Sequence, residues 1–147
     1  MRVEMNYGKG TLPIELSPDW EVTVIRKPDM PVIADPTSGL EAAFDAPVGV
    51  PPLDKLARDA KTACILICDI TRPVPNGVIL GPLIRRLIGA GMAAENITVL
   101  VATGLHRPND GAELEELVGD PWVLKTVRVK NHFARNDADH VHVGTTT

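Results

Sequence analysis

The chain has few aromatic residues, no cluster of basic residues and no long apolar run. Aromatic side chains make up 3% of the 147 residues, and 15 Lys and Arg stand against 19 Asp and Glu, for a net charge of −4. Scarce aromatics leave no surface for stacking bases, and scattered positive charge offers little to phosphate backbones or anionic lipid. We therefore expect neither nucleic acid nor a membrane as a partner.

No segment has the pattern of a membrane span or a secretion signal. The first residues, Met1–Asn6, contain no apolar stretch, and no run approaches the ~20 apolar residues that a transmembrane helix needs. The sequence predicts a soluble, cytoplasmic protein.

The chain has only two cysteines, Cys64 and Cys68, and both fall in one predicted strand. At ~3.3 Å per residue their Cα atoms would lie about 13 Å apart, whereas a disulfide needs them within about 7 Å. We interpret both as small apolar residues buried in the core, in a protein from a reducing compartment.

Motifs for phosphate, dinucleotides and zinc are also missing. The glycines at 8–10 and 89–91 lack the strand and helix context that such loops require. His140 and His142 would point the same way from a short strand, and His132 lies nearby, but no further ligands follow at zinc-site spacing. We expect no metal site within this chain.

Two short runs of aliphatic and β-branched residues, Ala63–Ile67 and Ile97–Val101, predict neighbouring core strands. Neither run alternates with polar residues, as expected of strands buried on both faces of a parallel sheet. Apolar residues at helical spacing over 79–88 lie between them, so the segment predicts one right-handed βαβ unit. Pro82 predicts a kink or a late start in this helix, and Gly89 marks its end.

Smaller elements are predicted around this unit. They are an N-terminal hairpin with strands at 3–7 and 12–16, a strand at 22–25, a short helix at 38–44, a helix that opens at 51–53, a helix preceded by a capping box of Asp110 and Glu113 and closed by Gly119, a strand at 127–129 and a short strand at 141–143. The whole predicts a single α/β domain over residues 1–147, with a mostly parallel, Rossmann-like sheet, flanking helices and an N-terminal β-hairpin.

Polar residues follow both core strands directly. Asp69 and Arg72 come after the first strand, and His106 and Arg107 after the second. Parallel strands deliver such loops to the same carboxyl edge, where open α/β folds bind ligands. A histidine can move a proton near neutral pH, and we expect the neighbouring Arg107 to favour its neutral, basic form. An arginine offers a fork to a substrate carboxylate.

Each of these residues also has a structural interpretation. Asp69 and Arg72 could form a pair that only ties down the loop, and His106 could hydrogen-bond to backbone within a turn. Thr71 and Thr103 could donate to a substrate, although threonines more often cap loops. The spacing alone leaves both interpretations open.

The two loops resemble one known family. The strings Asp69-Ile70-Thr71-Arg72-Pro73-Val74-Pro75 and Ala102-Thr103-Gly104-Leu105-His106-Arg107-Pro108 are similar to those of the amino-terminal domain of the nickel-pincer lactate racemase family. Pro47-Val48-Gly49, the helix at 83–87 and Glu113-Leu114 also fit. The resemblance covers about residues 45–144.

The resemblance implies a 2-hydroxy acid racemase or epimerase that uses a nickel pincer nucleotide derived from nicotinic acid. His106 would be the acid/base that takes the substrate hydroxyl proton, and Asp69 would support the site. Arg72 would hold the substrate carboxylate or the developing ketone. Thr71 and Arg107 would be further substrate-binding residues.

The family's cofactor lysine, a metal-ligating histidine and a second catalytic histidine have no counterparts in this chain. The resemblance therefore implies a domain fragment that lacks its C-terminal domain, binds no cofactor by itself and is inactive alone. A noncatalytic small-anion-binding module that uses Arg72 and Arg107 is the alternative from another class. Self-association through an exposed apolar face is a further expectation.

Overall fold

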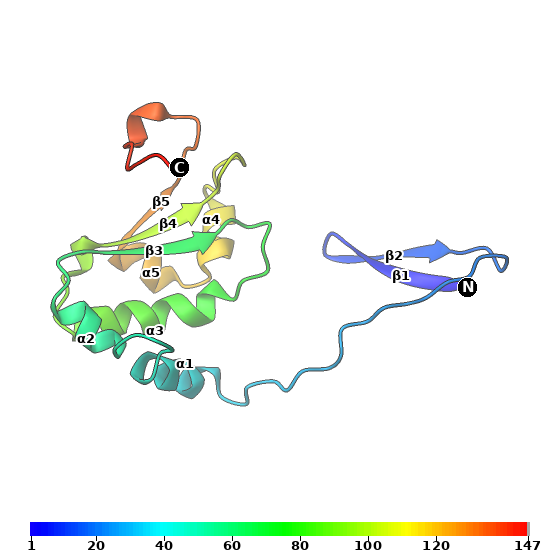
Figure 1. Ribbon diagram of the computed structural model, residues 1–147, viewed down its shortest axis with the longest axis horizontal. Coiled ribbons are helices and arrows are strands. Elements are labelled where there is room, and N and C mark those ends of the chain that lie inside the picture. The colour runs from blue at the N-terminus through cyan, green and yellow to red at the C-terminus, as the bar shows by residue number, and fades with distance from the viewer. Residues whose placement is uncertain (147) are drawn as a thin grey trace. The chain divides into compact units, whose positions relative to one another are not determined.

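The computed structural model describes residues 1–146. Contacts within the chain divide it into two compact units, Met1–Val32 and Ile33–Thr147, which are described separately. Together they have the predicted fold class, because the second unit contains a parallel sheet with flanking helices and the first contains an antiparallel hairpin (Figure 1).

The first unit is built on the predicted hairpin. Strands β1 (Arg2–Tyr7) and β2 (Gly10–Glu15) are antiparallel, and Gly8 turns the chain with a φ of +57°. The strand predicted at 22–25 is wrong: these residues have no regular structure, and Ile25 is 92% exposed. Residues that favour strands still need a neighbouring strand to pair with, and β1 and β2 pair with each other in their own two-stranded sheet.

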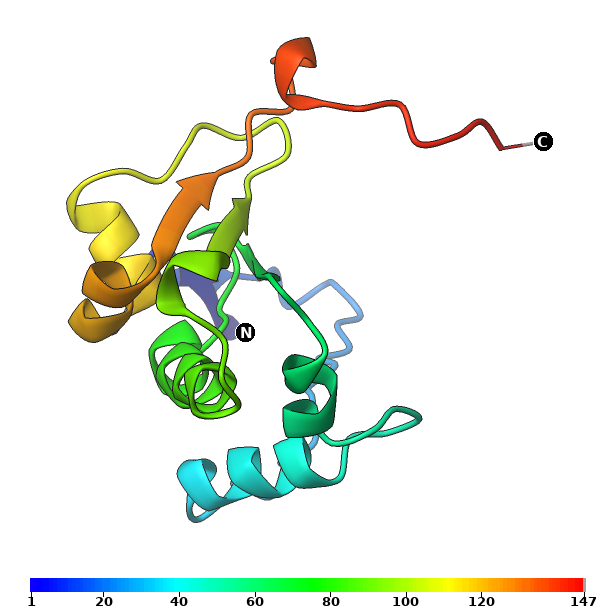
Figure 2. The same ribbon diagram turned by 90° about the vertical axis from the view of Figure 1, so that its left-hand side faces the viewer.

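The second unit contains a three-stranded parallel sheet in the order β3-β4-β5. Its strands are β3 (Ala63–Cys68), β4 (Ile97–Ala102) and β5 (Arg128–Asn131). Helix α3 (Asn76–Gly89) and the 3-10 turn η1 (Ala94–Asn96) connect β3 to β4, which completes the predicted βαβ unit. Helices α4 (Ala112–Val118) and α5 (Pro121–Thr126) connect β4 to β5 (Figures 1 and 2).

One face of the sheet carries the core. Ile97, Val99 and Val101 of β4 are fully buried against α3, where Ile84 is also fully buried, and against α4 and α5. The opposite face is open, since Leu66 of β3 is 68% exposed. The prediction that β3 is buried on both faces is therefore wrong. A second layer of helices would be needed to cover that face.

The prediction that the cysteines are buried is wrong for the same reason. Cys64 and Cys68 lie on the open face of β3, and both are exposed and free. No disulfide joins them, as the strand spacing requires.

Helices α1 (Pro36–Asp45) and α2 (Leu53–Arg58) pack against α3. Both were predicted, and α1 starts slightly earlier than expected because the Asp35 side chain accepts from the N–H groups of Thr37 and Ser38. Each of the three nitrogens of the Arg86 guanidinium in α3 donates to a different acidic side chain: to Glu41 and Asp54 at 2.5 Å each, and to Asp45. This cluster ties α1 and α2 to α3.

The helix ends differ from the predictions in three places. Pro82 lies inside α3, which begins at Asn76, so a late start is wrong. Glu113 does not close a capping box, because α4 begins at Ala112 and its N-cap residue, Gly111, makes no side-chain cap. Helix α5 was not predicted, although Asp120 caps it through the Trp122 N–H and Pro121 occupies its first turn.

The end of the described chain is irregular apart from one 3-10 turn. The strand predicted at 141–143 is wrong: the turn η2 (Asp137–Asp139) precedes this segment, which has no regular structure. Val141 and Val143 are 84% and 96% exposed, so they pack against nothing that would hold a strand. None of the helices within residues 1–146 is long and apolar enough to cross a bilayer.

Candidate functional site

The loops after β3 and β4 leave the sheet side by side. Cys68 and Ala102, the last residues of these strands, are register partners. The next residues, Asp69 and Thr103, are therefore the first of two adjacent loops at the carboxyl edge. This edge is the usual ligand-binding position of an open α/β sheet.

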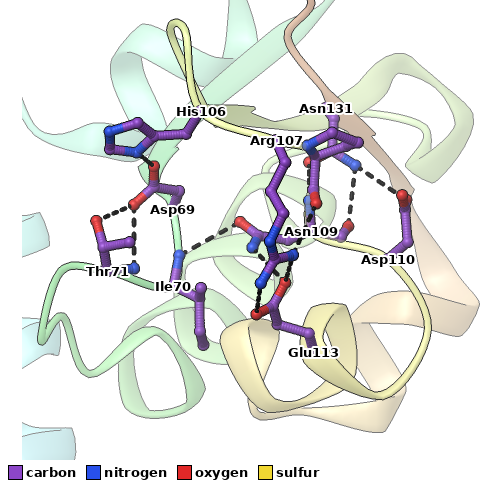
Figure 3. A network of polar contacts seen from close by, with 10 residues as sticks. Asp69, Ile70, Thr71, His106, Arg107, Asn109, Asp110, Glu113 and Asn131 are labelled. Carbon is purple, nitrogen blue, oxygen red and sulfur yellow. Dashed lines mark hydrogen bonds and ion pairs between the residues drawn. The ribbon is translucent and has the colours of Figure 1, made fainter. Parts of the chain in front are cut away.

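Asp69 and His106 meet at this edge (Figure 3). The imidazole Nδ1 lies 2.5 Å from Oδ2 of the Asp69 carboxylate, and Thr71 donates to Oδ1 through its hydroxyl (2.5 Å) and its N–H (3.1 Å). The Thr71 hydroxyl bond, with a second contribution from His106, lowers the pKa of Asp69 despite burial of the carboxylate.

An ionised Asp69 fixes the tautomer of a neutral His106. A carboxylate can only accept, so Nδ1 must donate its proton to Asp69 and Nε2 is left as the basic nitrogen. The His106 side chain is 53% exposed, so Nε2 is open to a ligand. The arrangement suits a general base held from behind by a carboxylate.

The turn that presents His106 is held from both ends. The His106 N–H donates to the Thr103 carbonyl at 3.0 Å, and Gly104 adopts a φ of +58° that a residue with a side chain rarely takes. The Thr103 hydroxyl donates to the His132 carbonyl. Thr103 is 3% exposed, so its hydroxyl supports the turn rather than facing solvent.

Arg72 faces the same hollow as His106. The hollow has a volume of about 340 Å³ and is lined by Cys68, Asp69, Arg72, Ala102, Thr103, Gly104, Leu105 and His106. Within residues 1–146 the Arg72 guanidinium has no hydrogen-bonding or ion-pairing partner, whereas the backbone N–H of Arg72 donates to the Asp69 carbonyl. An unpaired guanidinium beside a histidine can bind a carboxylate.

Arg107 points to a different partner. Its guanidinium makes a two-bond contact with Glu113, at 2.5 and 2.7 Å, which raises the pKa of Arg107 and lowers the pKa of Glu113 to about 2. The nearest charged group to the His106 ring is therefore the Asp69 carboxylate and not the adjacent cation that we expected. In this structure Arg107 is bonded to Glu113 and Thr71 to Asp69. A substrate contact by either residue therefore stays a prediction.

Sequence reasoning missed the residues that hold this site together. Asn109, Glu113 and Asn131 form a connected set of hydrogen bonds behind the two loops (Figure 3). Asn109 and Glu113 are only four residues apart, so their contact is local, but Asn109 precedes α4 and the helical spacing rule does not apply to it. Asn131 is 22 residues from Asn109, and no local pattern indicates that pair.

The remaining histidines do not gather into a metal site. His132 and His140 meet at their Nε2 atoms at 3.0 Å, and Nδ1 of His140 contacts the Asn136 carbonyl at 2.7 Å. Both contacts are hydrogen bonds between exposed groups. Within the part of the chain that the structure describes, no three His, Cys, Asp or Glu side chains are arranged to hold a metal ion.

A larger hollow, of about 520 Å³, lies at the other end of α3 around Arg86. Three of its charged groups bind one another, since Arg86 is paired with Glu41 and Asp54, and the Arg85 guanidinium lies 4.1 Å from the centre of the Trp122 ring. Its lining contains no histidine and no contact of a carboxylate with an imidazole such as that of Asp69 with His106. The carboxyl edge is therefore the candidate site.

The sequence matches the family model described as "Lactate racemase N-terminal domain" over residues 7–147. The match extends the resemblance to the turn and the second strand of the hairpin. Two curated proteins named lactate racemase are similar to the chain. The one from Lactiplantibacillus plantarum is 35% identical over 105 residues, which are 71% of this chain and 24% of that protein. The one from Thermoanaerobacterium thermosaccharolyticum is 29% identical over 145 residues, 97% of this chain and 34% of that protein.

A solved structure has the same fold. The structure of the lactate racemase apoprotein from Thermoanaerobacterium thermosaccharolyticum superposes with a TM-score of 0.76 at 29% sequence identity and covers 99% of this chain and 33% of that one. The chain thus spans about a quarter to a third of the length of the relatives that it matches.

Proposed function

Because the chain belongs to the family of lactate racemase N-terminal domains, we propose that it is the N-terminal catalytic portion, residues 1–147, of a longer cytoplasmic 2-hydroxy acid racemase or epimerase. That longer protein is called the parent below. The observation that carries the proposal is the contact of Asp69 with His106 at 2.5 Å, in a hollow that Arg72 also lines.

In this proposal the chain binds the substrate and moves one proton. Arg72 binds the carboxylate of the 2-hydroxy acid through its unpaired guanidinium. Nε2 of His106 then takes the hydroxyl proton, and Asp69 stabilises the imidazolium that forms. Thr71 and Arg107 would bind the substrate only if they gave up some of their hydrogen bonds to Asp69 and Glu113.

Loss of the hydroxyl proton lets the electron pair of the Cα–H bond leave as hydride, which gives a planar keto acid. Return of hydride to the opposite face inverts the centre. Hydride needs an electrophilic acceptor, which standard side chains do not provide. The nickel pincer nucleotide that the family resemblance implies would be this acceptor.

The residues present do not fit that group. The chain lacks the family's cofactor lysine, and residues 1–146 hold no set of three metal-ligating side chains. We therefore place the cofactor in the part of the parent outside this chain. Inversion also needs an acid/base on each face, and His106 serves one. The chain alone would not turn over, and its partner would be the parent's C-terminal domain.

The test is removal of the imidazole in the parent. His106→Gln should lower kcat for racemisation by about 10²–10⁴-fold, the usual contribution of a general base. His142→Gln, an exposed histidine away from the hollow, is the matched control and should keep parental activity. Full activity of His106→Gln would remove the assignment.

A noncatalytic anion-binding module is the second candidate, and the unpaired Arg72 favours it. This second candidate is weakened because Arg107, the other residue expected to bind the anion, is already paired with Glu113. Titration of the chain with lactate, malate and phosphate separates the two. Equally tight binding of all three, abolished by Arg72→Gln, would support the module. Selective binding of 2-hydroxy acids would support the racemase domain.

A further inference from the structure

Asn109 is a buried amide at the centre of the polar network behind the candidate site. It is 2% exposed, and both of its side-chain groups are bonded (Figure 3). Its Oδ1 accepts from the Ile70 N–H at 3.3 Å, and its Nδ2 donates to Glu113 Oε2 at 2.8 Å. One side chain therefore joins the loop after β3 to helix α4.

The backbone of Asn109 is bonded just as completely. Its N–H donates to Asn131 Oδ1, and its carbonyl accepts from Asn131 Nδ2, at 3.0 Å each. Asn131 is the last residue of β5. Its side-chain amide bonds to both the N–H and the carbonyl of Asn109, in the way that the backbone of a neighbouring strand would. Asn109 thus connects the exits of both outer strands, while it sits on the loop from the central strand.

These bonds lie next to the two residues that matter for the chemistry. Ile70 follows Asp69 directly, and Asn109 is three residues after His106. Glu113, the other partner of Asn109, also holds Arg107, the residue after His106. The two loops are therefore linked at a second place, in addition to the contact of Asp69 with His106.

We propose that Asn109 is a positioning residue that sets the separation of the Asp69 and His106 loops, and so keeps the proton on Nδ1 of His106, from where it is donated to the Asp69 carboxylate. Its role in turnover rests on the proposed function, but its effect on the imidazole does not. Only an amide of this length suits the position, since it must accept from an N–H and donate to a carboxylate at once. An aspartate would face Glu113 with a second carboxylate, and a leucine would leave the Ile70 N–H without its acceptor and would remove one of the donors to Glu113.

The test exchanges the donor and the acceptor in the hydrogen bond between Asn109 and Glu113. Asn109→Asp places two carboxylates together and adds one negative charge. The double variant Asn109→Asp with Glu113→Gln restores one donor and one acceptor and has the same net charge as the wild-type chain. Asn96→Asp, an exposed asparagine in the same unit, is the matched control. The readout is the ¹⁵N spectrum of the His106 ring in the 147-residue chain, taken where the imidazole is neutral, with His106→Gln for assignment.

In the wild-type chain and in Asn96→Asp, His106 should show the Nδ1–H form. Asn109→Asp should move His106 toward a mixture with the Nε2–H form, and the double variant should restore it. A folded Asn109→Asp with the wild-type His106 spectrum would overturn the proposal. If Asn109→Asp does not fold, the double variant decides: a wild-type His106 spectrum supports the proposal, and a mixed spectrum or a failure to fold overturns it.

A second readout separates positioning from substrate binding. In the parent, Asn109→Asp should lower kcat by about 100-fold, the cost of a displacement near 1 Å, while KM changes much less because Arg72 is untouched. An equal loss of kcat in Asn96→Asp, or a change in KM alone in Asn109→Asp, would count against a positioning role for Asn109. If the parent proves to have no racemase activity, the proposed function fails while the ring spectrum still tests Asn109.

Discussion

Asp69 and His106 share a 2.5 Å contact but differ sharply in exposure: the Asp69 side chain is 6% exposed and the His106 side chain 53%. The carboxylate is held inside by Thr71, and the imidazole is the part that a ligand can reach. The pair therefore has a fixed inner member and an accessible outer one, as a supported base requires.

Replacing the inner member tests this arrangement. Asp69→Asn removes the charge that keeps the proton on Nδ1, so kcat of the parent should fall by about 10²–10⁴-fold. Racemisation rates at saturating lactate check it. Thr71→Val, which removes only the hydroxyl bond to Asp69, should have a smaller effect, and the opposite order would show that Thr71 acts on the substrate itself.

The stability of the chain should depend on Glu113 in acid. Arg107, and after it Asn109, lower the pKa of Glu113 from 4.5 to about 2. A lowered folded-state pKa gives stability that is complete above the unfolded value and is lost as the pH falls toward 2. Urea unfolding of the wild-type chain and of Glu113→Gln between pH 7 and pH 2 should therefore give curves that approach each other in acid. A difference in the free energy of unfolding between wild type and Glu113→Gln that stays the same at every pH would contradict a stabilising ion pair.

The two faces of the sheet should respond differently to truncation. Ile84→Ala, at a fully buried position of α3, should cost about 2–5 kcal/mol in the free energy of unfolding. Leu66→Ala, on the open face, should cost within about 0.5 kcal/mol. Urea titration measures both. A large loss at Leu66 would mean that the open face is covered in solution, and sizing of the chain would then test self-association.

The cluster at Arg86 should be sensitive to salt. Arg86→Lys keeps the charge but replaces the fork that reaches Glu41, Asp45 and Asp54, so the melting temperature should fall. The loss should shrink at high salt, because these acidic side chains are partly exposed and their attraction is screened. Arg58→Lys, an exposed arginine of α2, is the control and should melt like the wild type. A loss that does not depend on salt would indicate packing rather than charge.

The sequence was sufficient for those features that depend on local pattern and on topology. The apolar runs at 63–67 and 97–101 became β3 and β4, and the parallel connection between them brought Asp69 and His106 to one edge. The hairpin followed from alternation and from the turn at Gly8. These features need only short-range spacing and the handedness of βαβ units.

Features decided by distant partners could not be predicted. The open face of β3 depends on whether anything covers it, which strand hydrophobicity does not reveal. Glu113 was expected to cap α4, but a two-bond contact with Arg107 competes for the same carboxylate. The pairing of Asn109 with Asn131 joins residues 22 apart and has no local signature.

The exposed thiols of β3 provide intrinsic reporters. Cys64 and Cys68 are free and lie on the uncovered side of the sheet. A thiol-specific probe would label both while the fold stays intact, and a domain that docks over this side would slow the reaction. The labelling rate, compared between the chain and its parent, would therefore map which surfaces the rest of the protein shields, without any engineered cysteine.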